Sequence, residues 1–295
     1  MKKIMLYLTA AGFMFASCQK DDEMSTSSAP GSKVSTTTSV GPVPGTFTQK
    51  VLIEKLTGQN EPAAPANERY FSGYAINSPS NKYYVASLYN SGYIGHAYTN
   101  RLIQVLGSGT PSMPTALVNR KAVNGSVYVR PYAMTQPINN AANVTAACGL
   151  AMTSSVTSRT ATINIHTGFN SLLTSNYRVN VYIIEDQVMS YDPKYSQANA
   201  YNNVPGSPFY NLGNPILNYQ HSNVVRGVVS GNGGDPISSA NTVPGGTQVF
   251  TYRADLPIPS NNSSKFYVMA FITDNLTKEV MNVQMGELGS TVDWN

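Results

Sequence analysis

Residues 51–65 decide the fold of the N-terminal half, and they read Val51-Leu52-Ile53-Glu54-Lys55-Leu56-Thr57-Gly58-Gln59-Asn60-Glu61-Pro62-Ala63-Ala64-Pro65. The apolar run at the start of this stretch predicts a strand, and Thr57-Gly58 ends it with a turn. The proline-rich segment that follows is typical of a first helical turn, where proline is well tolerated. The stretch therefore predicts a strand, a turn and a helix N-terminus in direct succession.

This succession resembles the way a thioredoxin-type domain presents its redox pair, normally Cys-x-x-Cys-Pro in the first turn of the helix. Here Glu61 and Ala64 stand at the two cysteine positions, and Pro65 still follows them. A carboxylate cannot attack a disulfide, and a methyl group cannot resolve a mixed disulfide. We expect Glu61 to be a structural replacement, because a negative charge is favourable near a helix N-terminus.

Three stretches, in this order, resemble the 28-kDa outer membrane protein family of Bacteroides-type bacteria. Residues 51–58 match its Val-Leu-Ile-Glu-x-x-Thr-Gly pattern, and 219–226 look like its Tyr-x-His…Val-x-Arg stretch. Residues 113–120 are similar to the Pro-Thr start of a thioredoxin-fold strand, where the proline is typically cis. The resemblance spans about residues 48–290. It implies an outer-membrane location and a thioredoxin-like domain without its redox pair.

Composition and length indicate a β-rich protein that works outside the cytoplasm. The 295 residues predict two domains, and only 12% are charged, while 19 are tyrosine. The formal charge of +4 includes Lys2 and Lys3 of the leader, and no basic patch is interleaved with aromatic residues. We therefore expect no nucleic-acid partner.

The N-terminus predicts a lipoprotein leader. Residues 1–17 carry a short basic segment and an apolar run that is too short to span a membrane permanently, and Cys18 follows small residues. We expect Cys18 to be acylated and to anchor the protein in the membrane; the alternative is an ordinary secretory signal with a chance cysteine. Residues 19–23 (QKDDE) resemble a surface-export signal or, alternatively, form a solvated start to the flexible tether, residues 18–47.

Residues 48–145 predict an α/β, thioredoxin-like domain. Strands are predicted over 49–56, 83–88 and 115–118, and helices over 62–76, 96–106 and, interrupted by prolines, within 127–144. In this fold, Pro65, Pro114 and Thr115 are expected to shape a groove that accepts an extended peptide.

Residues 146–295 predict an antiparallel β-sandwich, because short alternating strands are separated by turn clusters. These strands are expected over 161–166, 177–184, 224–229, 248–253, 266–273 and 280–285.

The long insertion 191–219 between two of these strands is rich in tyrosine. Tyrosines among Asn, Gln and Ser are typical of surfaces that contact proteins or glycans, so one interpretation is a binding surface. Its members would be Tyr191, Tyr195, Tyr201, Tyr210 and Tyr219. The other interpretation, which we slightly favour, is a loop that packs over the end of the sandwich through its own aromatic side chains.

Other reactive groups do not form a recognisable site. His96, His166 and His221 have no metal-type spacing, and Cys148 would be alone in the mature chain and is expected to be buried. We expect no catalytic residue, no metal and no cofactor.

The sequence thus predicts a non-enzymatic outer-membrane lipoprotein at the cell surface. Its role would be to bind another outer-membrane protein or an extracellular protein or glycan. The rival hypothesis is a degenerate thiol-disulfide oxidoreductase or another periplasmic enzyme, which requires a reactive Cys148 thiolate near Pro114.

Overall fold

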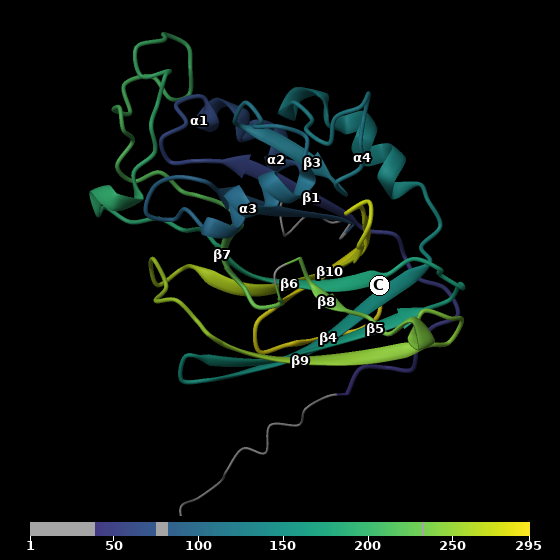
Figure 1. The fold of residues 1–295 in the computed structure, drawn as a ribbon. Coiled ribbons are helices and arrows are strands. Elements are labelled where there is room, and N and C mark those ends of the chain that lie inside the picture. The colour runs from purple at the N-terminus through teal and green to yellow at the C-terminus, as the bar shows by residue number, and fades with distance from the viewer. Residues whose placement is uncertain (1–38, 75–81, 232) are drawn as a thin grey trace, which may run out of the picture. The chain divides into compact units, whose positions relative to one another are not determined.

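The computed structural model describes residues 39–74, 82–231 and 233–295, all of which belong to one contact unit, Thr37–Asn295. The predicted signal peptide, Cys18 and most of the predicted tether lie outside the described residues, so acylation stays a prediction. The described chain contains two β-sheets (Figure 1).

The larger sheet combines strands from both halves of the chain. In spatial order it contains β11 (Val280–Glu287), β10 (Lys265–Asp274), β6 (Tyr177–Asp186), β7 (Val224–Val228), β2 (Tyr83–Tyr89), β1 (Val51–Thr57) and β3 (Thr115–Val118), while the short β8 (Asp235–Pro236) pairs with β6. β2 runs parallel to β1 and to β7, and the other pairs are antiparallel. The sheet therefore continues across residue 145, where the sequence predicts a domain boundary.

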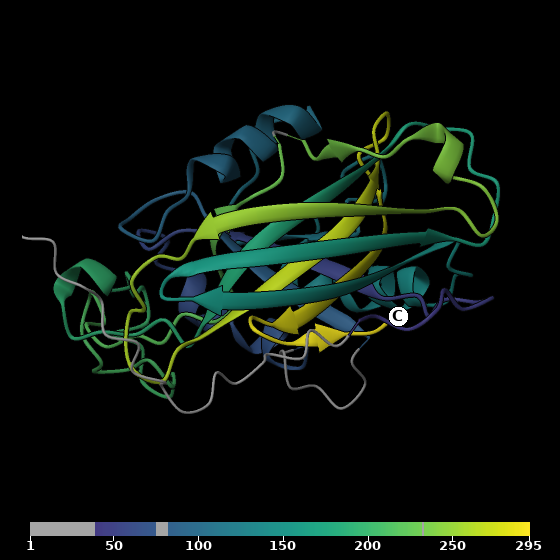
Figure 2. The ribbon, with the colours of Figure 1, turned by 90° about the horizontal axis from the view of Figure 1, so that it is seen from below.

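The smaller sheet is antiparallel throughout. Its order is β12 (Thr291–Val292), β4 (Cys148–Thr157), β5 (Thr160–Phe169) and β9 (Thr247–Asp255). Seen from below, β4, β5 and β9 lie across the strands of the larger sheet (Figure 2). Leu150 and Ile163 of this sheet share a buried cluster with Val181 and Val268 of β6 and β10. The predicted β-sandwich is thus present, and one of its layers belongs to the mixed sheet.

Helices cover both faces of the N-terminal strands. They are α1 (Ala64–Asn67), α2 (Arg69–Ser72), α3 (Ala97–Leu106) and α4 (Thr135–Ala142), and three 3₁₀ turns lie at Pro131–Ala133, Pro193–Tyr195 and Ser239–Asn241. Val51 and Ile53 of β1 pack with Ile138 of α4, whereas Leu52 and Leu56 pack with side chains of α3. All seven residues of β1 are buried, as expected for a strand covered on both faces.

The predicted helix over 62–76 is wrong in its extent within the described residues, and its last two positions, 75 and 76, lie outside them. The structure has the two short helices α1 and α2, and Glu68 closes the first and opens the second. Its backbone N–H donates to the carbonyl of Pro65 at 3.1 Å. Sequence periodicity does not reveal this break, because both helices keep apolar residues at a helical spacing.

Successive side chains of β6 point alternately into two different hydrophobic cores. Tyr182 faces the core shared with β1, β2 and α3, while Val179, Val181 and Ile183 face the smaller sheet. The N-terminal half therefore lies over one face of β6 and β10, and the smaller sheet covers the other (Figure 1).

Candidate functional site

The loop after β1 has the predicted strand–turn–helix geometry. The backbone N–H of Glu61 donates to the carbonyl of Gly58 at 3.1 Å, and that of Ala64 donates to the carbonyl of Glu61 at 3.0 Å. Both residues are half-buried, and α1 begins at Ala64. The two positions where a redox pair would stand are thus held in one tight turn.

The tyrosine-rich insertion lies against this loop. The Gln59 side-chain amide donates to the carbonyls of Lys194 and Ser196 at 2.9 and 2.8 Å. In return, the backbone N–H groups of Ala198 and Ala200 donate to the carbonyls of Gln59 and Pro62 at 2.8 and 2.9 Å. Residues 194–200 therefore satisfy the exposed backbone of the loop in the way that a neighbouring strand would.

Gln197 fixes this contact from within. Its side chain is completely buried, and its amide nitrogen lies 3.3, 3.1 and 2.9 Å from the carbonyl oxygens of Gly58, Gln59 and Glu61. An amide NH₂ group has two hydrogens, so the three carbonyls share two donors. A single side chain of the insertion thus holds three carbonyls of the loop around it.

The predicted peptide groove is not open at the residues named for it. Pro65, Pro114 and Thr115 are all buried, and the Thr115 hydroxyl donates to the carbonyl of Val129 at 3.0 Å. The Met113–Pro114 peptide bond is cis, as the resemblance implies. The strand start is therefore as expected, but packing covers the side chains that would line a groove.

The insertion separates its tyrosines into inward and outward groups. Tyr195 is buried, Tyr201 and Tyr219 are half-buried, and Tyr191 and Tyr210 are 79% and 42% exposed. Inward packing by the insertion's own aromatic side chains is therefore present, while a binding surface on its outward side stays a prediction. The outward side chains that stay available for contact also include aliphatic residues, namely Val204, Leu212 and Leu217.

His221 is buried beneath the insertion. Its Nε2 lies 2.8 Å from the carbonyl of Tyr195, and its Nδ1 lies 3.0 Å from the hydroxyl of Tyr89. Because a carbonyl can only accept, Nε2 carries the proton and Nδ1 accepts from Tyr89. Burial lowers the pKa of His221 to about 4, so the ring is neutral near pH 7. It serves as a link between β2 and the insertion.

Cys148 is fully buried between the two sheets, as predicted. Burial raises the pKa of its thiol to about 12, so the thiolate is scarce at neutral pH. Within the described residues there is no group of three or more His, Cys, Asp and Glu side chains that could hold a metal ion.

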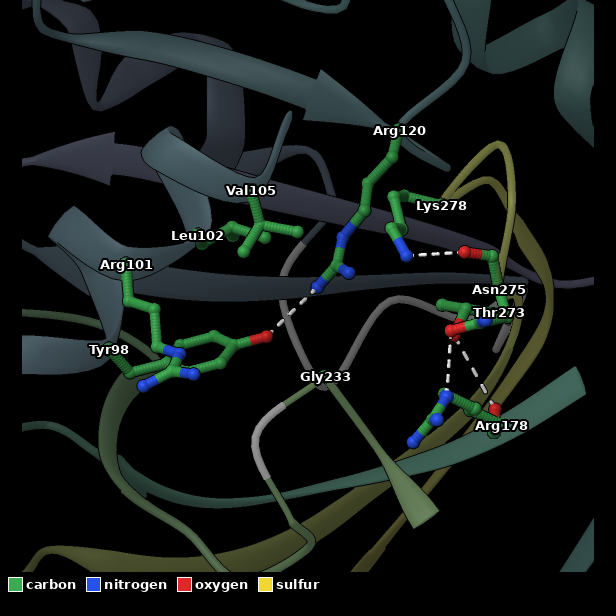
Figure 3. A pocket seen from close by; sticks show the side chains of 10 residues that line it. All are labelled: Tyr98, Arg101, Leu102, Val105, Arg120, Arg178, Gly233, Thr273, Asn275 and Lys278. Carbon is green, nitrogen blue, oxygen red and sulfur yellow. Dashed lines mark hydrogen bonds between the residues drawn. The ribbon is translucent and has the colours of Figure 1, made fainter. Parts of the chain in front are cut away.

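A pocket that the sequence did not predict lies at the start of β6. It encloses about 210 Å³ between α3, the end of β3 and the turn between β10 and β11. Four cationic side chains lie around its space, as Figure 3 shows: Arg101, Arg120, Arg178 and Lys278. Leu102, Val105 and Tyr98 of α3 supply its apolar wall.

Arg120 at the back of the pocket is compensated. Its Nε and one terminal nitrogen each lie 2.7 Å from the Glu54 carboxylate, and both side chains are almost completely buried. The Tyr182 hydroxyl lies 2.9 Å from the same carboxylate and 3.1 Å from the Tyr98 hydroxyl. This network joins β1, α3 and β6, and it explains the acidic residue in an otherwise apolar strand.

The sequence does not predict the pocket, because its lining residues come from five separate segments of the chain. One signal was available: in a chain with few charges, Glu54 and Arg120 each stand within or directly after a predicted buried strand. A charge at such a place needs a buried partner of opposite sign.

No helix among the described residues has the length and apolarity that a membrane crossing requires.

Comparison with known proteins places the chain in a family. The solved structure of HBP35 of Porphyromonas gingivalis is similar with a TM-score of 0.60, at 17% sequence identity, over 83% of this chain and 77% of that chain. This likeness shows a shared fold. Among curated proteins, none matches this chain. The family model described as "Outer membrane protein Omp28" matches residues 101–292, which is more than half of the sequence. The chain belongs to the Omp28 family of outer membrane proteins.

Proposed function

We propose that this outer membrane protein is a lipoprotein, anchored through Cys18, that binds a protein or glycan partner without catalysing a reaction. The observation that carries the proposal is the contact between the insertion and the loop at 58–62. This contact occupies the loop where a redox site would act on its substrate, and it leaves the other side of the insertion free for a partner.

We further propose that the N-terminal half derives from a thioredoxin-like scaffold. Support comes from the strand–turn–helix order at 51–67, the parallel pairing of β1 with β2, and the cis bond before Pro114. Glu61 and Ala64 replace both thiols, and the one cysteine besides Cys18, Cys148, is buried. Binding rather than thiol exchange is the role that these residues support.

The binding surface would be the outward side of the insertion. It carries Tyr191, Tyr210 and Leu217, which are exposed although they are large and apolar. Tyrosine offers a large amphipathic area with few rotatable bonds, so it suits a surface that contacts a protein or a glycan. The partner class is another outer-membrane protein, or an extracellular protein or glycan.

Crosslinking and pull-down from intact cells test this surface. The tagged full-length lipoprotein would be compared with the triple variant Tyr191→Ser, Tyr210→Ser, Leu217→Ser. Deleting the whole insertion is less informative, because it would uncover the polar backbone of the loop at 58–62. The matched control exchanges three exposed apolar side chains elsewhere: Tyr132→Ser, Leu172→Ser and Ile258→Ser.

We expect a specific crosslinked partner with the parent and the control, and its loss with the insertion variant. A glycan array with the same three proteins covers the case of a carbohydrate ligand. Equal capture by all three proteins, with no glycan signal lost in the insertion variant, would overturn the assignment of this surface.

The anchor and its orientation need separate measurements. With Cys18→Ala we expect loss of acyl labelling and of sedimentation with the outer membrane. A membrane-impermeant lysine reagent should label the parent on intact cells if the protein is at the surface. Protection from the reagent in intact cells, with labelling after lysis, would place the protein on the periplasmic side.

A further inference from the structure

The pocket at the start of β6 holds more positive charge than the residues around it neutralise. Arg101, Arg178 and Lys278 form no ion pair within the described residues, in contrast to Arg120 with Glu54. The nearby carboxylate of Asp274 accepts from the backbone N–H groups of Leu276 and Thr277. The Asp235 carboxylate accepts from the Tyr252 hydroxyl and the Gly231 backbone.

Two of the three cations are held in place by neutral acceptors. Nε of Arg178 donates to Oδ1 of Asn275, and Nη1 donates to the carbonyl of Gly234, both at 2.7 Å. Nζ of Lys278 donates to the backbone carbonyl of Asn275. A guanidinium has five N–H donors and an ammonium has three, so both groups are oriented and still have donors to spare. Arg101 has no partner among the described residues and is exposed.

This arrangement is suited to an anion. Cations that share one hollow repel each other, and a bound anion with several oxygens removes that repulsion while it accepts charge-assisted hydrogen bonds. Arginine is well matched to the planar or tetrahedral oxygens of carboxylate and phosphate groups. The apolar wall of Leu102 and Val105 lies beside the charges, so the ligand would also carry an apolar part.

We propose that this pocket binds a small organic anion, in which a phosphate or carboxylate group meets Arg101, Arg178 and Lys278 and an apolar body lies against Leu102 and Val105. The volume of about 210 Å³ suits a ligand about the size of a phenyl phosphate or somewhat larger. A second hollow shares Tyr98 and Arg101 and extends along α3 to His96, which gives room for a longer ligand body.

The site is independent of the partner surface proposed above. Arg178 lies at the start of β6, and the insertion begins after the end of this strand at Asp186. Eight residues of extended chain separate the two ends by about 25 Å. A ligand here would therefore not contact the insertion directly.

Calorimetric titration of the full-length lipoprotein in a non-ionic detergent tests the proposal. The probes are phenyl phosphate, benzoate, inorganic phosphate and, as the neutral control, benzyl alcohol. The variant is Arg101→Gln, because Arg101 is exposed and unpartnered, so that its loss should leave the fold intact. Lys278→Gln is the second variant, and Arg130→Gln, an exposed arginine outside this pocket, is the matched control.

We expect one of the two aromatic anions to bind, with an affinity that falls as salt is added and that falls about tenfold in each pocket variant. The Arg130→Gln variant should bind as the parent does. Preference for phenyl phosphate or for benzoate identifies the head group.

Four outcomes would overturn the proposal in whole or in part. Absence of binding by both aromatic anions at millimolar concentrations, or equal binding by the parent and both pocket variants, would refute the site. Benzyl alcohol binding as well as the anions would refute the role of the cations. Inorganic phosphate binding as tightly as phenyl phosphate would refute the apolar contact.

Discussion

The loop at 58–62 and the pocket beside Arg178 both contain several polar groups at a strand terminus. Only in the loop do other residues of the protein satisfy these groups with hydrogen bonds. At the loop, backbone carbonyls accept from N–H groups of residues 197–200, and the Gln59 side-chain amide donates to carbonyls of Lys194 and Ser196. At the pocket, three cations keep unused donors. Peptide groups can be satisfied by any segment that lies alongside, whereas surplus charge of one sign requires an ion of the other.

The largest expected effect comes from the one compensated cation of the pocket. Arg120→Met should lower the free energy of unfolding by about 3–5 kcal/mol, because it leaves the buried Glu54 carboxylate without its counter-charge. Urea denaturation of the purified protein measures this change.

The double variant Glu54→Gln, Arg120→Met should recover part of the loss, since it removes the unpaired charge. Arg130→Gln, on the surface, serves as the control, with a change within about 0.5 kcal/mol. A single variant as stable as this control would show that the pair is not the buried link described here.

We expect a pH effect of similar size on stability at His221, which lies beneath the insertion. The pKa of His221 is lowered to about 4 by burial, compared with about 6.5 in the unfolded chain. Above pH 6.5 the ring is neutral in both states. As the pH falls from 6.5 to 4, only the unfolded state takes up the proton, so stability is lost, by about 3 kcal/mol at most.

Comparison of urea midpoints across this pH range, for the parent and for His221→Asn, isolates this contribution. Carboxylates titrate in both proteins and cancel in the difference. His166→Asn, at a half-buried ring, is the matched control and should change the profile less. Parallel profiles for all three proteins would contradict the buried link between Tyr89 and Tyr195.

A smaller effect is expected where the insertion meets the loop. Gln197→Ala removes a buried amide from three carbonyls and should cost about 2 kcal/mol. Hydrogen exchange should speed up at the N–H groups of Ala198 and Ala200, which report on local opening. Gln220→Ala, at an exposed glutamine, should leave exchange unchanged. Unchanged protection in Gln197→Ala would mean that the backbone contacts alone hold the segment.

The smallest effect carries the opposite sign. Arg101→Gln should leave stability unchanged or raise it by up to about 0.5 kcal/mol at low salt, because it relieves repulsion among the pocket cations. The gain should vanish at high salt, where surface charges are screened. Thermal unfolding at two salt concentrations measures it, and a clear loss of stability would show that Arg101 has a structural role.

Local patterns in the sequence predicted most of the strands. The third strand, Thr115–Val118, is confirmed with the same bounds, and β6 alternates between its two cores. Such strands can be predicted locally, because the alternation of apolar and polar residues indicates which faces of a strand are buried. The pairing of β2 with β7 could not be predicted in this way, because alternation indicates a strand but not the strand with which it pairs.

The candidate sites depended even more on contacts between distant residues. Glu61 and Ala64 could be read from a local motif, and the structure places them in the expected turn. Gln59 and Gln197 have no pattern that links them, and the pocket cations come from α3, β6 and a turn near the C-terminus. Polar side chains on separate segments produce no periodic pattern in the sequence. The contact between Gln59 and the insertion and the cluster of pocket cations could therefore be identified only from the structure.

The position of β7 in the larger sheet has a consequence for biogenesis. The Ser87 hydroxyl donates to the carbonyl of Ser222 across 135 residues of chain, and this contact lies where β2 meets β7. During synthesis from the N-terminus, one edge of β2 therefore stays unpaired until most of the chain has been made. An open, apolar strand edge invites pairing with other chains, and such long-range closure slows folding. We therefore expect the polypeptide to be prone to aggregation until residue 224 has been made, and its yield to depend on holdase chaperones that keep it extended until then.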